Sequence, residues 1–177
     1  MSRKAYTIGY GHGTRQFELD EERVLLEMAA ARVDAEPDET EEVRRALKNP
    51  IGSPPLNEIV RPGETICIIT SDITRPCPSA VILPPLLEEL ELAGIHLDDI
   101  TVVFALGSHR RHTEEEQERL VGPAVYSLVH TVDSDPEDTV YLGMTALGTP
   151  VNITSVVAQA DRRILVGNIE YHYFAGY

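Results

Sequence analysis

Two short apolar runs, each followed by a polar loop, constrain the fold of this chain more than any other feature. Residues 65–70 (Thr-Ile-Cys-Ile-Ile-Thr) and 100–106 are continuous and rich in β-branched side chains, which is typical of strands buried on both faces of a parallel sheet. Leucines at helical spacing lie between them, and Pro84 and Pro85 fit the first turn of that helix better than its middle. With a last buried strand expected at 163–166, the order strand, helix, strand, helix, strand predicts a mostly parallel sheet.

The remaining segments complete an α/β architecture around that sheet. Thr113 and Glu116 form a T-x-x-E capping box, which predicts that a helix starts after the second strand. Further elements are expected as strands at 5–8 and 16–19 around a Gly-His-Gly turn, a helix over 38–47, a strand within 126–132, a hairpin over 139–153 and a helix over 154–160. The sequence therefore predicts a single domain over residues 1–177, with a doubly wound, mostly parallel sheet, helices on both faces and a small N-terminal β-hairpin.

Charge and composition argue against several classes of partner. The net charge of −14 repels the phosphates of nucleic acids and anionic lipids, so we expect no nucleic acid and no membrane as partners. No run of eighteen apolar residues is present, and the N-terminus lacks the apolar stretch of a secretion signal. The two cysteines, Cys67 and Cys77, do not make a disulfide framework, and Cys67 is expected in the core. A cytoplasmic location follows as the expectation.

Unusual polar residues follow three of the expected strands. The loops are residues 71–75 (Ser-Asp-Ile-Thr-Arg), 107–110 (Gly-Ser-His-Arg) and 167–176 (Gly-Asn-Ile-Glu-Tyr-His-Tyr-Phe-Ala-Gly). If the strands are parallel, all three loops emerge at one edge of the sheet, and ligands of open α/β sheets bind beyond the carboxyl ends of the strands. The sequence therefore predicts a functional site at this edge.

Two histidines in these loops, His109 and His172, are the candidate proton carriers of that site. Histidine has an ordinary pKa of about 6.5, so its ring can give or take a proton near neutral pH. Reactions that invert a stereocentre need one such group on each face of the substrate. Arg75 can hold a carboxylate or phosphate through two hydrogen bonds. Together with Asp72, these residues indicate acid/base chemistry on a small anionic substrate.

Simpler interpretations of the same residues remain open at this point. Asp72 and Arg75 could form an ordinary ion pair within their loop. His109 could cap the neighbouring helix or lie in solvent, and His172 could be packed in the core beside Phe174.

A metal site is a weaker interpretation of the histidines. His109 and His112 form an H-x-x-H pair, but in a loop this spacing needs further ligands, and we expect His112 to lie on the surface. A zinc hydrolase using His109, His112 and His172 is the least favoured function, because no carboxylate stands at metal-ligand spacing.

Five segments carry a resemblance to a known family. They are Asn49-Pro-Ile-Gly-Ser-Pro-Pro-Leu56, Ser71-Asp-Ile-Thr-Arg-Pro76, Leu83-Pro-Pro-Leu-Leu-Glu-Glu-Leu90, Ala105-Leu-Gly-Ser-His-Arg110 and Gly167-Asn-Ile-Glu-Tyr-His-Tyr-Phe-Ala-Gly176. With these segments in this order, the chain resembles the nickel-pincer-nucleotide-dependent lactate racemases and related 2-hydroxyacid racemases and epimerases, in which the segments follow one another in the same order. The segments span nearly the whole chain, and as a set they are specific.

The resemblance implies a function and a cofactor. The cofactor is a pyridinium mononucleotide that carries nickel through sulfur and carbon, and it accepts a hydride from C2 of a 2-hydroxyacid while a histidine removes the hydroxyl proton. The hydride then returns to the opposite face of the keto intermediate. By this resemblance His109 and His172 are the catalytic acid/bases. The cofactor-binding residues are Asp72, Ile73, Thr74 and Arg75, and Arg75 also contacts the substrate.

The resemblance also implies that part of the machinery lies outside this sequence. In the family, the lysine that holds the cofactor and the histidine that ligates nickel follow the segment that here ends before Tyr177, so no metal ligand is expected within the chain. We expect an N-terminal fragment whose partner is the C-terminal remainder of the enzyme. The isolated chain is expected to bind no nickel cofactor tightly and not to racemise, and stoichiometric nickel in the purified chain would contradict this.

Two positions depart from the family pattern. Arg111 and Tyr171 stand where the family has proline, so the first could alter the charge near the substrate and the second the loop that aims His172. The alternative function is a non-catalytic module that binds a small carboxylate through Arg75.

Overall fold

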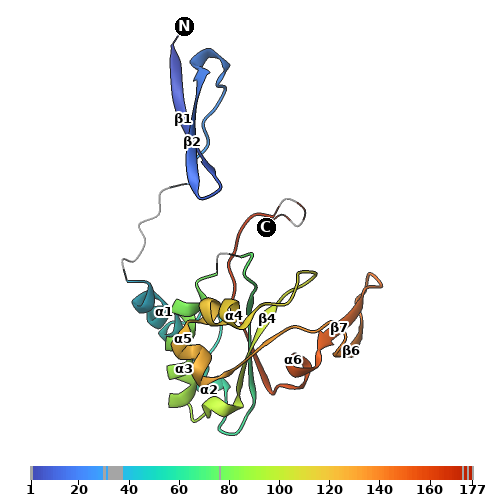
Figure 1. Cartoon of the computed structure of the whole chain (residues 1–177). Coiled ribbons are helices and arrows are strands. Elements are labelled where there is room, and N and C mark those ends of the chain that lie inside the picture. The colour runs from blue at the N-terminus through green and yellow to red at the C-terminus, as the bar shows by residue number, and fades with distance from the viewer. Residues whose placement is uncertain are drawn as a thin grey trace. The chain divides into compact units, whose positions relative to one another are not determined.

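Figure 1 shows the computed structural model of the chain, in which residues 2–29, 31, 38–75, 77–172, 174 and 176 are described. The chain divides into two compact units, Met1–Ala35 and Glu36–Tyr177. Within the described residues, no helix has the length and apolar character needed to cross a membrane.

The first unit is a β-hairpin, as predicted. Strands β1 (Arg3–Tyr10) and β2 (Gly13–Asp20) are antiparallel, and a short 3-10 helix, η1 (Glu21–Arg23), follows. The turn between the strands has Gly11 at φ +58°, a backbone conformation that glycine adopts without strain. Across the strands the rings of Tyr6 and Phe17 stack with centroids 5.8 Å apart, a cross-strand pair that stabilises such hairpins.

The second unit contains the predicted parallel sheet. Its strands β3 (Ile66–Ser71), β4 (Ile100–Ala105), β5 (His130–Asp133) and β8 (Arg162–Leu165) are all parallel, in the order β5-β4-β3-β8. Strands β6 (Thr139–Met144) and β7 (Pro150–Thr154) form a separate antiparallel pair. The helices are α1 (Glu39–Lys48), α2 (Leu56–Ile59), α3 (Ser79–Leu92), η2 (Leu97–Asp99), α4 (Glu114–Val121), α5 (Pro123–Leu128) and α6 (Ser155–Gln159).

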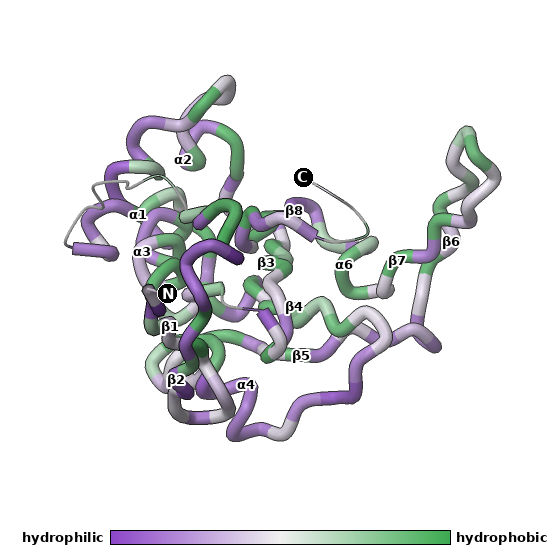
Figure 2. The backbone as a smooth tube through the Cα atoms, turned by 90° about the horizontal axis from the view of Figure 1, so that it is seen from above, coloured by the Kyte–Doolittle hydropathy of each residue, from purple (hydrophilic) through white to green (hydrophobic). Residues whose placement is uncertain are grey.

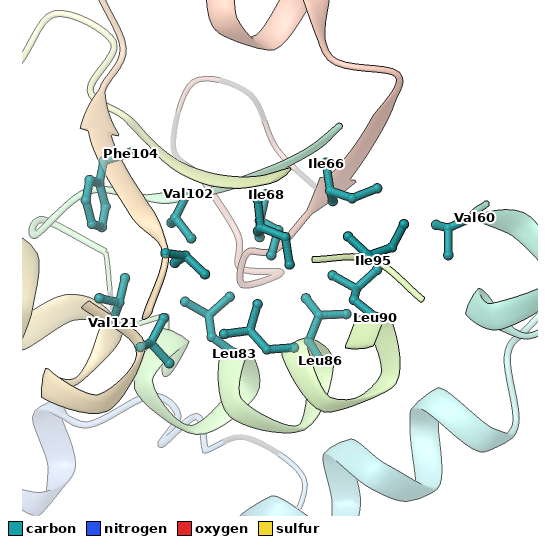
Figure 3. Packing of buried hydrophobic residues seen from close by; sticks show 14 residues of the cluster. Val60, Ile66, Ile68, Leu83, Leu86, Leu90, Ile95, Val102, Phe104 and Val121 are labelled. Atoms are coloured by element: carbon teal, nitrogen blue, oxygen red, sulfur yellow. The ribbon is translucent and has the colours of Figure 1, made fainter. Parts of the chain in front are cut away.

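The core lies between α3 and one face of the sheet (Figure 3). Leu83 and Leu86 on α3 face Ile68, Val102 and Phe104 on the strands, and all five are at most 3% exposed. Burying side chains of this size contributes roughly 1.5–3 kcal/mol each, which makes this layer the main source of stability of the unit.

The opposite face of the sheet is covered in part by α6. Residues of this helix border a hollow together with Cys67 and Thr101, whose side chains point away from the core layer. Cys67 is 1% exposed, and burial raises the pKa of its thiol to about 11. The predicted core position of Cys67 and the prediction of helices on both faces are therefore confirmed.

The expectation that Pro84 and Pro85 occupy the first turn of their helix was wrong. Helix α3 begins at Ser79, so both prolines lie in its second turn, where each removes a backbone donor. Leu83, Leu86 and Leu90 are buried in the core against the sheet, and Pro85 is buried as well. The packing of this helix therefore outweighs the loss of two backbone hydrogen bonds. Helix propensities do not include such tertiary packing.

Strand β8 was predicted as a buried strand, and this was also wrong. It lies at the edge of the sheet, beside β3 alone, and its residues alternate between half-buried and exposed. Ile164 packs on the core, whereas Leu165 on the other face is 81% exposed. An apolar run of three residues, Ile164 to Val166, does not distinguish an edge strand from a central one, because both place one face on the core.

Helix α4 begins with the predicted capping box. Thr113 Oγ1 accepts from the backbone N–H of Glu116, and Glu116 Oε2 accepts from the backbone N–H of Thr113. Figure 2 shows α4 as mostly hydrophilic, in contrast to the apolar β3. Its first turn is fixed by this cap and by an ion pair, in which Arg110 donates to Glu116 at 2.7 and 2.8 Å, and at its end Val121 is buried in the core.

Replacing Glu116 by glutamine tests the charge of this cap. Hydrogen bonds from Arg110 and from the backbone of Thr113 lower the pKa of Glu116 to about 2, against an ordinary value of 4.5. A carboxyl group with a lowered pKa stabilises the fold only when it is ionised. We therefore expect Glu116→Gln to lower the free energy of unfolding above pH 4.5 and the deficit to disappear as the pH falls towards about 2.

Urea unfolding measured across this pH range checks the prediction. Glutamine preserves the capping box, so Glu116→Ala serves as the control that loses the cap as well and keeps a deficit at low pH. A deficit of Glu116→Gln that did not change with pH would contradict the assignment to charge.

Candidate active site

The carboxyl ends of three parallel strands border one cavity of about 770 Å³. It is lined by the ends of β3, β4 and β8 and by the loops that follow them, namely Ile69, Thr70, Ser71, Asp72, Arg75, Ala105, Leu106, Gly107, Ser108, His109, Leu165, Val166, Gly167, Asn168 and Ile169. The predicted convergence of these loops is confirmed. The volume lies within the range of small-molecule sites, and the position is where open α/β sheets bind ligands.

Asp72 and His109 form the central contact of this cavity. His109 Nδ1 lies 2.6 Å from Asp72 Oδ2, and Asp72 is 4% exposed whereas the His109 side chain is 47% exposed. Burial raises the pKa of Asp72, but hydrogen bonds from Thr74 and His109 lower it by more, so its net pKa lies below the ordinary value. A buried, ionised carboxylate therefore supports a histidine that is half exposed at the cavity.

The loop after β3 is a tight turn organised by Asp72. The backbone N–H of Arg75 donates to the Asp72 carbonyl at 3.1 Å, and Thr74 donates to Asp72 Oδ1 through Oγ1 at 2.7 Å and through its backbone N–H at 3.2 Å. Both carboxylate oxygens of Asp72 are thus engaged by Thr74 and His109.

The side chain of Arg75 pairs with Thr74 and Glu170 and not with the Asp72 carboxylate, so the simple interpretation of an Asp72–Arg75 ion pair was wrong. Its Nε lies 3.8 Å from Glu170 on the loop after β8, and both side chains are nearly half exposed. An exposed pair at this distance contributes little free energy. The guanidinium of Arg75 therefore lies at the cavity with a weak partner that a ligand can replace.

Gly107 gives the loop after β4 its shape. It has φ +59°, in the left-handed region, and the turn is closed by the backbone N–H of His109 donating to the Leu106 carbonyl at 3.0 Å. This turn directs His109 back towards Asp72. His109 does not cap α4, because Thr113 occupies that role.

His172 lies on the loop after β8 and is not among the residues that line the cavity. Its backbone pairs with Gly176 through two hydrogen bonds of 2.9 and 2.7 Å, and its Nδ1 accepts from the backbone N–H of Phe174 at 3.2 Å. Phe174 is 84% exposed, so it does not enclose His172 in a core. The structure therefore groups Asp72, Arg75 and His109 and holds His172 in a local turn; its neighbours in the motif, residues 173 and 175, lie outside the described residues.

His112 is a residue that the sequence analysis misjudged. It was expected on the surface, yet its side chain is 1% exposed and its Nδ1 lies 2.6 Å from Asp133 Oδ1. Its Nε2 lies 3.2 Å from the backbone nitrogen of Ile73, so both ring nitrogens are engaged within the protein. His112 is therefore not placed to join His109 as a metal ligand. Across the part of the chain that the structure describes, no group of three or more His, Cys, Asp or Glu side chains could hold a metal ion.

Arg111, the departure noted beside His109, is also paired. Its guanidinium lies 2.6 Å from Asp135 Oδ2, and both side chains line a second hollow together with His109. The additional positive charge is therefore offset locally by Asp135.

Comparisons with known proteins agree on one family. Residues 10–177 match the family described as the lactate racemase N-terminal domain. The chain is 33% identical to a lactate racemase of Thermoanaerobacterium thermosaccharolyticum over 175 residues, which is 96% of this chain and 41% of that protein. It is 35% identical to a lactate racemase of Lactiplantibacillus plantarum over 178 residues, which is 98% of this chain and 42% of that protein. The chain thus spans about two fifths of the length of these relatives.

Solved structures extend the similarity to the fold. The lactate racemase apoprotein from T. thermosaccharolyticum superposes with a TM-score of 0.82 at 31% identity, covering 97% of this chain and 40% of that chain. A protein from Thermotoga maritima superposes with a TM-score of 0.55 at 17% identity, covering 75% of this chain and 34% of that chain, and shares the fold alone.

Proposed function

Because this chain belongs to the lactate racemase N-terminal domain family, we propose that residues 1–177 are the N-terminal, substrate- and cofactor-binding part of a longer enzyme that interconverts the stereoisomers of a 2-hydroxyacid. Lactate is the first candidate substrate, since both curated relatives are lactate racemases. The observation that carries the proposal is the pair formed by buried Asp72 and half-exposed His109 at the ligand-binding edge of the sheet.

The Asp72 carboxylate prepares His109 for proton transfer. Since Asp72 Oδ2 accepts from His109 Nδ1, the Nδ1 position carries a proton and Nε2 of the neutral ring has a free lone pair. Nε2 is then the atom that takes the hydroxyl proton of the substrate. The imidazolium that forms is stabilised by the adjacent carboxylate, which stays ionised because its pKa is lowered.

His172 and Arg75 complete the proposed set of residues. We assign His172 to the opposite face of the substrate, as the proton carrier for the other stereoisomer, since it lies on the loop after β8 that also borders the cavity. Arg75 exchanges its weak contact with Glu170 for the carboxylate of the hydroxyacid, through two charge-assisted hydrogen bonds.

The cavity fits the organic part of a nickel-pincer nucleotide, which we propose as the cofactor of the complete enzyme. Its volume of about 770 Å³ is sufficient for a nucleotide-sized group, and Ser71, Ser108 and Asn168 add polar side chains to the lining. When bound, this group would supply the acceptor for the hydride from C2 of the substrate. We propose, as the resemblance implies, that the histidine that ligates nickel belongs to the C-terminal remainder of the enzyme. In the turn Asp72–Arg75, Ile73 and Thr74 hold the backbone beside the cofactor and Arg75 presents its guanidinium.

The experiment uses the complete enzyme, loaded with its cofactor and supplied separately with the two enantiomers of lactate. We expect each enantiomer to be converted to an equal mixture, and Arg75→Lys to raise KM at least tenfold, since an ammonium does not reproduce the paired hydrogen bonds of a guanidinium (about 1.5–3 kcal/mol for a charged hydrogen bond). Glu170→Gln is the matched control, because it removes the present partner of Arg75 and leaves the guanidinium in place.

The alternative, a module that binds a small carboxylate without catalysis, is distinguished in the same preparation. Heat of binding for hydroxyacids by calorimetry without interconversion of any of them, with the cofactor present, would contradict the proposed racemase.

A further inference from the structure

His112 is held in the core by partners on both of its ring nitrogens. The ring packs edge-on against Phe104, with centroids 5.2 Å apart, and its Nδ1 lies 2.6 Å from Oδ1 of Asp133. Its Nε2 lies 3.2 Å from the backbone nitrogen of Ile73. Because the N–H of Ile73 can only donate, Nε2 accepts, and the single ring proton sits on Nδ1 and is donated to Asp133.

Asp133 binds both the backbone and the ring of His112. Its Oδ2 accepts from the backbone N–H of His112 at 2.8 Å while Oδ1 accepts from the ring, and its side chain is only 4% exposed. Asp133 is the last residue of β5 and lies opposite Phe104 in the β4–β5 register. One carboxylate therefore sets both the position of the His112 backbone and the orientation of its ring.

The hydrogen bond from the Ile73 N–H to His112 Nε2 connects the His112–Asp133 pair to the candidate active site. Ile73 stands inside the turn Asp72–Arg75, in which Thr74 and Arg75 donate to Asp72 and Asp72 Oδ2 contacts His109. The bond from Ile73 to His112 ties the turn to β5, which lies beyond β4 in the sheet. The buried ring of His112 therefore holds the turn through Ile73, while Asp72 of the same turn lines the cavity.

We propose that His112, supported by Asp133, is a positioning residue that sets the turn Asp72–Arg75 and so the direction in which Asp72 meets His109. An apolar residue of similar size would fill the space beside Phe104 but would leave the Ile73 N–H and the Asp133 carboxylate without their buried partner. The effect on catalysis rests on the proposed function, whereas the effect on the turn does not.

Two substitutions separate the two contacts of the ring. In His112→Gln the side-chain carbonyl reaches the position of Nε2 and can accept from Ile73, whereas in His112→Asn the amide reaches only the position of Nδ1 and can donate to Asp133. Amide hydrogen exchange of Ile73 and Thr74 is measured in this chain and in both variants, with the amides of β3 and β4 as internal controls.

We expect His112→Asn to accelerate exchange at Ile73 on the order of tenfold and His112→Gln to restore protection, with little change in β3 and β4. Equal exchange at Ile73 in both variants, or a uniform loss of protection throughout the sheet, would overturn the proposal and leave His112 as a packing residue.

A measurement on the unmodified chain keeps the proposal testable if a variant does not fold. Long-range proton–nitrogen correlation spectra of the histidine rings report which nitrogen carries the proton. We expect His112 to carry it on Nδ1, and a proton on Nε2 would exclude the bond from Ile73.

In the complete enzyme, we expect His112→Asn to lower kcat several-fold with a smaller change in KM, and His112→Gln to recover most of the loss. If the enzyme proves to have another activity, the exchange and proton measurements still decide whether His112 sets the turn. An enzyme in which both variants lost activity equally, with Ile73 protected in each, would contradict a positioning role.

Discussion

Replacing His109 by alanine is expected to lower kcat of the proposed racemase by about 10²- to 10⁴-fold, the range supplied by a positioned general acid or base. The change removes the ring whose Nδ1 contacts Asp72 and which lines the cavity. KM should change far less, because Arg75 and the polar lining of the cavity remain. The measurement is the initial rate of racemisation of each lactate enantiomer.

A double-mutant cycle with Asp72→Asn shows how the two residues act together. If Asp72 serves His109 alone, Asp72→Asn in the His109→Ala background causes no further loss in kcat, whereas Asp72→Asn alone reduces kcat strongly. Additive losses would mean that Asp72 has a separate role, as in direct contact with the cofactor. His130→Ala is the matched control, since His130 is an exposed histidine on β5 outside the cavity lining. Activity of His109→Ala equal to that of this control would contradict the assignment.

Replacing Phe104 by alanine is expected to lower the free energy of unfolding by about 3–5 kcal/mol, the usual loss for a large aromatic residue removed from a core. Phe104 is fully buried, packs against α3 and supports the ring of His112. Because a domain of ordinary stability has about 5–15 kcal/mol in total, the variant should be close to unfolding at ambient temperature. Urea unfolding at neutral pH measures the loss.

Two variants calibrate the effect of Phe104. Phe104→Leu keeps most of the buried volume and should lose clearly less than alanine, whereas Phe174→Ala removes an 84% exposed ring and should change stability by no more than about 0.5 kcal/mol. A loss for Phe104→Ala as small as that for Phe174→Ala would show that the layer between α3 and the sheet is not the main source of stability.

The elements that could be predicted are those in which local pattern and burial agree. Strands β3 and β4 have continuous β-branched runs because both faces are covered, and α4 starts at a cap whose two side chains lie three residues apart. Because these strands are parallel, their carboxyl ends lie at the same edge of the sheet, and this predicts that the three loops meet at one cavity.

The contacts that could not be predicted depend on partners far away in the sequence. Asp133 lies 21 residues from His112, and their pairing exists only because β5 adds to the sheet beside β4 in one register. The spacing H-x-x-H indicated that His112 lies on the surface. Its hydrogen bond to the buried carboxylate of Asp133 instead allows the ring to be buried. The prolines of α3 were misplaced for a related reason, since the sheet that buries their helix lies outside any local window.

The pairing of β3 with β8 also has a consequence for how the protein is made. Thr65, next to β3, donates two hydrogen bonds to Asp161, next to β8 and 96 residues later in the chain. The strand that completes the lining of the cavity therefore pairs with β3 across most of the second unit. Contacts of such long sequence separation form slowly, because the entropy of closing the intervening loop is lost before the contact stabilises it. During synthesis, β3, α3 and β4 emerge well before β8, and the open edge of β3 is exposed until residues 162–165 arrive. The interval between these two events is when the nascent chain is most open to strand pairing with other chains.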